Sequence, residues 1–377
     1  MIAGRRHHKH HARMAATALL AFAPVALSLS PLRPISNAAT IPPAASNGMK
    51  ISIVGNHFVD ANGATLQLRG VNRSGTQYAC SEGWGIFDGP NDAISVAAMA
   101  AWHINAVRVN GNEDCALGIN GVKAQYAGDN YISALKTYVN LLHSYGMYAI
   151  VDLHHSAPGT KKASGQVPMP DADHSATYWA TMAYAFKDDT AVMFDMFNEP
   201  YPNSNRDTTA AWTCVRDGGT CAGVSFTTVG MQQLVNVVRG TGATNPIMVS
   251  GPEYAGDLDR WIEFKPTDIL NQLAASVHIY GKPIDSPYSN PATWDQFVAP
   301  VALQFPVVEG EGLDSNCTHK LSDQFLPWAD AHGVSYTLWA WFVGNCSSEP
   351  SLISNYNGTA TNYGVGLKTH LSGMAVK

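Results

Sequence analysis

The sequence lacks the features that several common classes of protein require. Only 14% of its 377 residues are charged, and no basic run or basic amphipathic segment occurs after the first 39 residues. Nucleic acids and anionic membranes are therefore not expected as partners, because both are bound through clustered Lys and Arg. No strand-like run is followed by G-x-G-x-x-G or G-x-x-x-x-G-K-[ST], so the best sequence signal for nucleotide binding is missing.

The sequence also contains no motif that is typical of a metal or cofactor site. The six cysteines include no C-x-x-C pair, so a zinc ribbon is not expected. His154 stands beside His155 and shares a strand face with Asp152, but no third ligand has a suitable spacing. We therefore expect neither a metal nor any other cofactor.

The N-terminus has the layout of a secretory signal peptide. The apolar run MAATALLAFAPVALSLS follows basic residues, and small residues come after it in SNAAT. The run contains a proline and is shorter than the roughly 20 apolar residues of a membrane-spanning helix. We expect residues 1–39 to be a signal peptide, cleaved near Ala38 or Ala39, and residues 40–49 to be a linker. An uncleaved anchor is the alternative.

Cleavage would change the charge of the chain and its surroundings. The remaining residues would carry 18 basic and 29 acidic side chains, a formal charge of −11, which suits a neutral ligand. An even number of cysteines in an exported chain favours disulfides. We expect three local pairs, Cys80–Cys115, Cys214–Cys221 and Cys317–Cys346, with reduced buried thiols as the alternative.

Residues 50–377 repeat a pattern of apolar strand and helical stretch, which predicts a single domain of α/β class. Two β-rich runs around residues 61–63 predict an N-terminal β-hairpin. Eight further strands are expected at residues 68–72, 106–110, 148–154, 191–198, 246–251, 274–280, 306–311 and 335–341. Strands that alternate with helices indicate a parallel sheet, and eight of them favour a closed (β/α)₈ TIM barrel over an open sheet.

Polar and aromatic residues stand at the ends of these strands. Active sites of such barrels lie where the strands end, so these side chains should meet in one cleft. Two of them, Glu199 and Glu311, are carboxylic acids. A pair of acids at the mouth of a barrel is typical of glycosidic bond cleavage, in which one acid protonates the leaving oxygen.

The strand ends also resemble glycoside hydrolase family 5, the cellulase family of clan A, from about residue 50 onward. The motifs that carry the resemblance are, in chain order, LRGVN, AVRVN, DLHH, FNEP, HIY, PVVEGE and TLWAW. The resemblance implies a secreted, monomeric, retaining endo-β-1,4-glucanase that acts on an oligo- or polysaccharide. A β-mannanase, a mixed-linkage glucanase or an exo-acting β-glycosidase of the same family are alternatives. A non-catalytic carbohydrate-binding barrel is a more distant one.

By this resemblance Glu199 is the general acid/base and Glu311 the nucleophile, since the family places its nucleophile five residues after the proline, here Pro306. Glu309 lies on the same side of the strand and is the competing candidate, or else a buried partner of a barrel arginine. The family usually has a bulky residue and then glycine after the nucleophile. This chain has Gly312 and Leu313 there, so the floor beneath the nucleophile is expected to differ.

The resemblance further assigns residues that bind substrate or position the acids. Asn198 would bind the sugar 2-hydroxyl, Tyr280 and Arg108 would hold the nucleophile, and Trp339 would form a platform under the sugar. His154 and His278 would position hydroxyls or carboxylates. Weaker candidates, for which core packing or loop support is the alternative, are Trp84, Trp212, Glu253, Tyr254 and Trp341, the last expected on the same face as Trp339. The long loops 155–175 and 201–226 would shape one end of the cleft.

Overall fold

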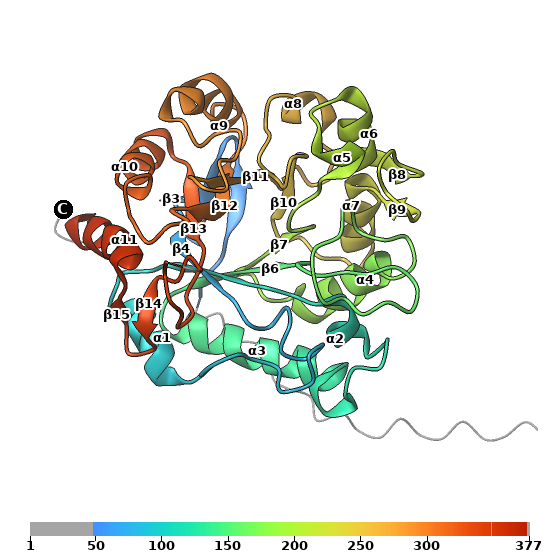
Figure 1. Cartoon of the computed structure of the whole chain (residues 1–377), viewed down its shortest axis with the longest axis horizontal. Helices are drawn as coiled ribbons and strands as arrows, with labels where there is room; N and C mark the ends of the chain where they lie inside the picture. Colours follow the sequence, from blue (N-terminus) through green and yellow to red (C-terminus); the bar gives the residue numbers. More distant parts are fainter. Residues whose placement is uncertain (1–47, 348, 375–377) are drawn as a thin grey trace, which may run out of the picture. The chain divides into compact units, whose positions relative to one another are not determined.

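Eight parallel strands close into a barrel in the computed structural model, which describes residues 48–347 and 349–374 (Figure 1). The strands, in chain order, are β4 (Arg69–Arg73), β5 (Ala106–Val109), β6 (Tyr148–Asp152), β7 (Val192–Asp195), β10 (Ile247–Ser250), β11 (Leu273–Tyr280), β12 (Val307–Leu313) and β13 (Ser335–Leu338). β13 pairs with β4 and so closes the ring. The predicted (β/α)₈ barrel is confirmed, with one strand at each expected position. The expected signal peptide, residues 1–39, lies outside the described residues.

A small antiparallel sheet precedes the barrel. It contains β1 (Ser52–Val54), β2 (His57–Val59) and β3 (Thr65–Leu66). β2 and β3 form the predicted hairpin, but the first β-rich run also turns back on itself at Gly55, whose φ of 61° favours glycine. Ile53 and Phe58 pack in one apolar cluster with Ala106 and Tyr148, the first residues of β5 and β6. This sheet therefore covers the N-terminal end of the barrel, and the opposite end is left for the site.

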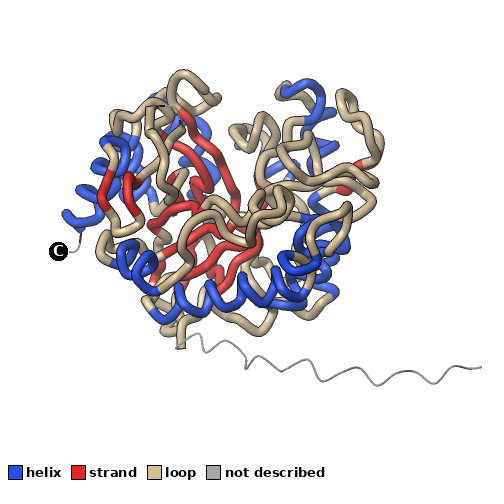
Figure 2. The backbone as a smooth tube through the Cα atoms, turned by 60° about the horizontal axis from the view of Figure 1, so that its bottom comes forward, coloured by secondary structure: helices blue, strands red, loops and turns tan. Residues whose placement is uncertain are grey.

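Helices surround the barrel strands (Figure 2). They are α1 (Ala93–Ala100), α3 (Asp129–Ser144), α4 (Ser175–Phe186), α7 (Met231–Gly240), α8 (Trp261–Phe264), α9 (Ala299–Ala302), α10 (Ser322–His332) and α11 (Asn362–Met374). In α3 the buried residues Tyr131, Leu135, Tyr138 and Leu142 recur every three or four positions, which gives one apolar face toward the barrel. Within the described ranges, none of the helices combines the length and apolar character needed to cross a membrane.

The helical segment between β11 and β12 consists of three short pieces. A 3-10 turn, η2 (Pro291–Thr293), is followed by a π-helical turn, η3 (Trp294–Val298), and then by α9. Pro300 lacks an N–H and is tolerated only near the start of a helix, which explains why α9 begins at Ala299.

The loops at the C-terminal ends of the strands carry the remaining elements. These are α2 (Glu113–Leu117), η1 (Ala124–Tyr126), α5 (Pro202–Asn205), α6 (Thr209–Asp217), β8 (Gly218–Gly219), β9 (Thr228–Val229), β14 (Ile353–Asn355) and β15 (Thr359–Ala360). Disulfides join Cys80 to Cys115, Cys214 to Cys221 and Cys317 to Cys346, the three local pairs that the spacing suggested.

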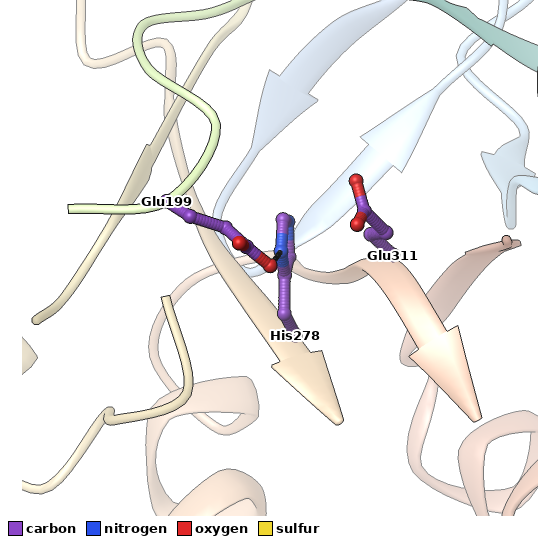
Figure 3. Close-up of side chains that lie close together, drawn as sticks. All are labelled: Glu199, His278 and Glu311. Atoms are coloured by element: carbon purple, nitrogen blue, oxygen red, sulfur yellow. Dashed lines mark hydrogen bonds and ion pairs between the residues drawn. The ribbon is translucent and has the colours of Figure 1, made fainter. Parts of the chain in front are cut away.

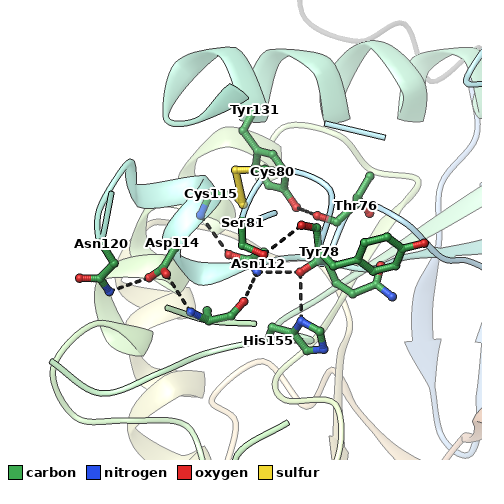
Figure 4. Close-up of a disulfide and its surroundings, with 12 residues drawn as sticks. Thr76, Tyr78, Cys80, Ser81, Asn112, Asp114, Cys115, Asn120, Tyr131 and His155 are labelled. Carbon is green, nitrogen blue, oxygen red and sulfur yellow. Dashed lines mark hydrogen bonds between the residues drawn. A yellow bond between two sulfur atoms is a disulfide. The ribbon is translucent and has the colours of Figure 1, made fainter. Parts of the chain in front are cut away.

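The loops around the first disulfide are also held by hydrogen bonds (Figure 4). The side-chain amide of Asn112 donates to the carbonyl oxygens of Gln77 (2.6 Å) and Ala163 (2.7 Å). His155 Nδ1 lies 3.0 Å from the same Gln77 oxygen. His155 therefore supports the loops next to the cleft, and three barrel loops are tied together there.

Candidate active site

The two acids that the sequence singled out lie close together at the C-terminal end of the barrel. Glu199 follows β7, Glu311 belongs to β12, and His278 of β11 lies beside them (Figure 3). One oxygen of each carboxyl group and one ring nitrogen of His278 all lie within 4.8 Å of one another. Both acids are buried, with 7% of Glu199 and 5% of Glu311 exposed. The site thus brings two carboxyl groups into one small, largely dry space.

Glu311 is held by two hydrogen bonds from opposite sides. Its Oε2 accepts from Arg108 Nη1 at 3.1 Å, and its Oε1 accepts from the Tyr280 hydroxyl at 2.8 Å. Hydrogen bonds that involve an ionised group are about twice as strong as neutral ones. The two donors expected beside Glu311 therefore both contact it, and they fix the orientation of its carboxyl group.

Arg108 is the fully buried centre of a network of acids. Its guanidinium contacts Asp152 at 2.8 Å, Asp195 at 2.9 Å and Glu311 at 3.1 Å, and it donates to Asn198 Oδ1 at 2.9 Å. Burial opposes the charged form, but the three carboxylates raise the pKa of Arg108 above its ordinary value. Burial also raises the pKa of Asp195 to about 7. The acid inside the apolar strand β7 is therefore a partner of the barrel arginine.

Glu199 has the environment of an acid that keeps its proton near neutral pH. Burial raises the pKa of Glu199 to about 7, although His154, Arg108 and a hydrogen bond from Gln166 act in the opposite direction. Its Oε1 lies 2.9 Å from His278 Nδ1, and its Oε2 accepts from the side-chain amide of Gln166. A general acid/base works best when its pKa lies near the operating pH.

His278 orients Glu199 as an uncharged ring. Burial lowers the pKa of His278 to about 3, so the imidazole is neutral over the usual working range. Its Nε2 has no hydrogen-bond partner among the described residues. A Cβ atom on Gly310 would lie 3.1 Å from that nitrogen, so the glycine lets the ring approach β12 closely.

Glu199, His278 and Glu311 also have a spacing that a metal ion could use. Most of the possible ligand atoms are already engaged: His278 Nδ1 contacts Glu199, and both oxygens of Glu311 contact Arg108 and Tyr280, whereas His278 Nε2 is unpartnered in the part of the chain that the structure describes. A metal ion would have to displace these hydrogen bonds. The donor set is therefore better suited to orienting the two acids.

Three residues predicted to contact sugar surround the acids. His154 Nδ1 lies 2.8 Å from Asp152 Oδ2, and its ring stacks on Trp339 with centroids 5.4 Å apart. The side-chain nitrogen of Asn198 is buried and has no partner among the described residues. An unpartnered donor of this kind needs a ligand, and a sugar hydroxyl is a suitable acceptor.

A cleft of about 730 Å³ extends from the two acids toward the loops that follow β10 and β11. Its walls include Gln166, Glu253, Tyr254 and Asp285. Glu253 and Tyr254 were expected at this end. The ring of Tyr254 stacks on Tyr201 with centroids 4.3 Å apart, so an aromatic pair flanks the cleft.

Two of the weaker tryptophan candidates belong to the core instead. Trp341 is fully buried and packs edge-on against Trp102, with ring centroids 4.9 Å apart. It does not share a face with Trp339, because β13 ends at Leu338 and the strand alternation stops there. Trp212 is 2% exposed and donates its indole N–H to Asp207. The core-packing alternative therefore applies to both tryptophans.

Trp84 remains available to a ligand. It is 59% exposed and stacks on Tyr78 with ring centroids 6.0 Å apart. An exposed indole that is held by a second aromatic ring is a suitable surface for the apolar face of a sugar.

Glu309 takes no part in the paired-acid arrangement. It is fully buried, burial raises its pKa well above the ordinary value, and no hydrogen bond or ion pair joins its side chain to Arg108 within residues 48–347 and 349–374. The suggested contact with a barrel arginine is therefore wrong. The position of Glu309 helps to explain why residue 312 is glycine. A Cβ atom on Gly312 would lie 2.6 Å from Glu309 Oε1 and 2.2 Å from the Ile279 carbonyl oxygen. A bulky residue after Glu311 has no room.

Gln166 was not singled out from the sequence, although its loop was expected to shape the cleft. It lies in the irregular loop 155–175, between residues of ordinary loop composition, and matches no motif. Asp152 and Asp195 could be expected near the strand ends, but their common contact with Arg108 depends on barrel closure.

Comparison with known proteins agrees with this geometry. The chain matches the family described as cellulase (glycosyl hydrolase family 5) over residues 59–345. Endoglucanase A of Butyrivibrio fibrisolvens is 25% identical over 77% of the chain and 59% of its own length. The aligned part of the chain spans 27% to 32% of the other curated relatives, which are also endoglucanases.

Solved structures show the same fold. A β-glucanase from Saccharophagus degradans has a TM-score of 0.64 at 19% identity, covering 86% of this chain and 94% of its own. A β-mannanase from Streptomyces thermolilacinus, solved with mannohexaose, has a TM-score of 0.62 at 17% identity, covering 87% and 96%. The family match covers most of the chain and includes both acids of the site. The chain therefore belongs to glycosyl hydrolase family 5, the cellulase family.

Proposed function

We propose that the chain is a retaining endo-β-1,4-glucanase with Glu199 as acid/base and Glu311 as nucleophile. The observation that supports this most strongly is the spacing of the acids, whose nearest ligand atoms lie within 4.8 Å. Retaining glycosidases hold their carboxyl groups about 5–5.5 Å apart, and inverting ones about 6.5–9.5 Å. An inverting mechanism needs room for a water molecule between acid and sugar, so this close approach of the two acids favours the retaining one.

In the proposed first step, the Glu311 carboxylate attacks the anomeric carbon while Glu199 gives its proton to the leaving oxygen. The C–O bond to the leaving sugar breaks, and a covalent glycosyl ester forms on Glu311. In the second step Glu199, now ionised, takes a proton from water, and the water oxygen replaces Glu311 at the anomeric carbon. Tyr280 and Arg108 keep Glu311 aligned in both steps.

The surrounding residues support sugar binding at the same point. The free amide nitrogen of Asn198 would donate to the 2-hydroxyl, a hydrogen bond that strengthens in the transition state. Trp339 would lie under the sugar ring, with His154 stacked against its indole.

The choice of a β-1,4-glucan rests on the endoglucanase names of the curated relatives. The fold alone does not separate glucan from mannan, because the β-mannanase structure is about as similar as the β-glucanase structure. A β-mannanase is therefore the second candidate. Initial rates on soluble β-glucan, glucomannan, mannan, xylan and aryl-glycosides would decide, and a fall in viscosity with few new reducing ends would indicate endo action.

The catalytic assignment is tested with Glu199→Gln and Glu311→Gln on the best polymer. Each variant keeps the shape of the side chain, so sugar binding should persist while turnover is lost by several orders of magnitude. Glu263→Gln, at an exposed acid remote from the cleft, is the matched control. Wild-type rates in either active-site variant would overturn the assignment and favour a binding function.

We further propose that the protein is exported after removal of residues 1–39. The basic and apolar N-terminus has the layout of a signal peptide, and three disulfides suit an oxidising compartment. The intact mass of the protein recovered from the medium should correspond to a chain that begins near residue 39 or 40. A full-length chain retained in the cell would contradict export.

A further inference from the structure

Both carboxyl oxygens of Glu199 are occupied when the cleft is empty. His278 contacts Oε1, and the side-chain amide of Gln166 donates to Oε2. Gln166 is exposed and lines the part of the cleft that extends from the acids toward Glu253 and Tyr254. The acid/base of the free site is therefore covered on its cleft side by a residue from the loop 155–175.

This contact suits only one of the two forms that Glu199 must adopt. The nitrogen of a glutamine side chain is a donor and cannot accept a proton. A hydrogen bond donated to a carboxyl group favours the ionised form, so Gln166 opposes protonation of Glu199. The first chemical step needs the proton on Glu199, with the acid oxygen free to reach the leaving oxygen. The second step needs the ionised form.

The backbone beside Gln166 is fixed, so a change would be confined to the side chain. Upstream, Ala163 N–H donates to Asp114 Oδ2 at 2.8 Å. Downstream, Tyr201 N–H donates to the Pro168 oxygen at 2.9 Å. A long exposed side chain between two anchored points can change rotamer on the nanosecond timescale or faster, without movement of the loop.

The leaving sugar would bind where Gln166 now lies. Gln166, Tyr254 and Glu253 line the open cleft beside the acids, whereas Trp339, His154 and Asn198 are not part of its walls. The cleft on the side of Gln166 therefore has the space for the departing part of the substrate. A sugar hydroxyl can accept the amide N–H that Gln166 gives up.

We propose that Gln166 is a positioning residue that senses the leaving-group site: it binds Glu199 Oε2 when the site is empty and turns to the leaving sugar when it is filled. The inference rests on the proposed acid/base role of Glu199. Substrate binding then frees Glu199 to keep its proton for the first step. Departure of the leaving sugar restores the contact and favours the ionised Glu199 that activates water.

The test compares pH profiles of Gln166→Met, which has similar length but no N–H donor, with the wild type. Other charged or titratable groups near Glu199 are unchanged in this variant; they are Arg108, His154, Tyr201, His278, Tyr280 and Glu311. The substrate is a short oligosaccharide of whichever polymer the enzyme cleaves best. Ser164→Ala, at an exposed position of the same loop, is the control.

The profile of kcat/KM reports the free enzyme, and that of kcat reports the complex. We expect Gln166→Met to raise the basic limb of kcat/KM by about half to one pH unit and to move the basic limb of kcat much less. Hydrolysis of the glycosyl-enzyme, measured with a dinitrophenyl glycoside whose leaving group needs no proton, should slow at pH 6 to 7. Ser164→Ala should match the wild type in all three measurements.

Two outcomes would overturn the inference. Unchanged basic limbs would show that Gln166 has no influence on Glu199, and a uniform loss of activity at every pH would indicate a merely structural role. Neither outcome touches the proposed function, which fails only if Glu199→Gln or Glu311→Gln keeps activity.

Discussion

At the scale of single residues, Glu199 and Glu311 have the same side chain but different surroundings, and the proposed division of roles rests on that difference. Glu199 is buried beside neutral groups, His278 and Gln166, whereas Glu311 receives hydrogen bonds from Arg108 and Tyr280. Different environments can give two carboxyl groups different pKa values, so that one keeps its proton while the other is ionised.

The first residue-scale prediction concerns pH. In the proposed mechanism Glu199 is protonated for the first step, and burial raises its pKa to about 7. The active form is therefore present below this value and is lost as pH rises through it. The kcat/KM should fall about tenfold per pH unit well above pH 7, measured with a substrate that has a poor leaving group. A constant kcat/KM up to pH 9, in protein shown by circular dichroism to be folded, would contradict the assignment.

The second prediction concerns Tyr280, whose hydroxyl donates to Glu311 Oε1 at 2.8 Å. A hydrogen bond to a charged group contributes about 1.5–3 kcal/mol. Tyr280→Phe should therefore lower kcat/KM roughly 10- to 100-fold without loss of folding. Tyr184→Phe, on an exposed tyrosine of α4, is the control and should leave kcat/KM unchanged. An equal effect of the two substitutions would show that Tyr280 does not act through its hydroxyl.

Residue-level prediction from the sequence succeeded where a motif stands at a strand end. Asn198–Glu199 and Glu311 have fixed positions relative to β7 and β12, so their meeting follows from the barrel. Gln166 could not be predicted from a strand-end motif, because an irregular loop has no periodicity from which the direction of a side chain can be inferred. Glu309 has the periodicity of an inner residue but makes no contact with Arg108, since the local path of β12 shifts register beside Val277.

At the scale of elements, the loops at the cleft depend on cross-links. Cys80–Cys115 joins the loops after β4 and β5, and hydrogen bonds of Asn112 and His155 connect both to the loop after β6. The loop after β6 carries Gln166. The position of one wall of the cleft therefore depends on a covalent link that is distant from the chemistry.

Removal of this disulfide should destabilise the protein more than removal of the shorter one. Cys80 and Cys115 are 35 residues apart, and Cys214 and Cys221 are 7 apart. The loss of loop-closure entropy predicts about 4 kcal/mol for the first pair and about 2 kcal/mol for the second. Thermal or denaturant unfolding of the two double Cys→Ala variants would measure this. Equal or reversed losses would contradict the entropic explanation.

The strands were easier to predict than the helices. Each barrel strand is a short apolar run that ends in polar residues, and this pattern reflects burial on both faces followed by the site. Helix lengths were harder, because Pro300 breaks the segment over residues 292–304 and the connection after β10 keeps only the four-residue α8. Trp341 was misplaced because β13 ends three residues before it.

At the scale of the whole molecule, the two ends of the barrel differ in the residues that cover them. The sheet of β1, β2 and β3 covers the N-terminal end with apolar side chains, while the C-terminal end carries the acids, the cleft and the disulfide-linked loops. Burial raises the pKa of Glu199, and an oxygen of its carboxyl group lies within 4.8 Å of one of Glu311. The proposed retention of configuration rests on this short separation.

The stereochemistry of the first product tests this claim most directly. Proton NMR of the anomeric region, recorded within the first minutes of hydrolysis of the preferred β-glycan, would distinguish the two anomers before mutarotation. Two displacements through Glu311 predict that the β-anomer appears first. Initial appearance of the α-anomer would mean a single displacement by water and would contradict the assignment of Glu311 as nucleophile.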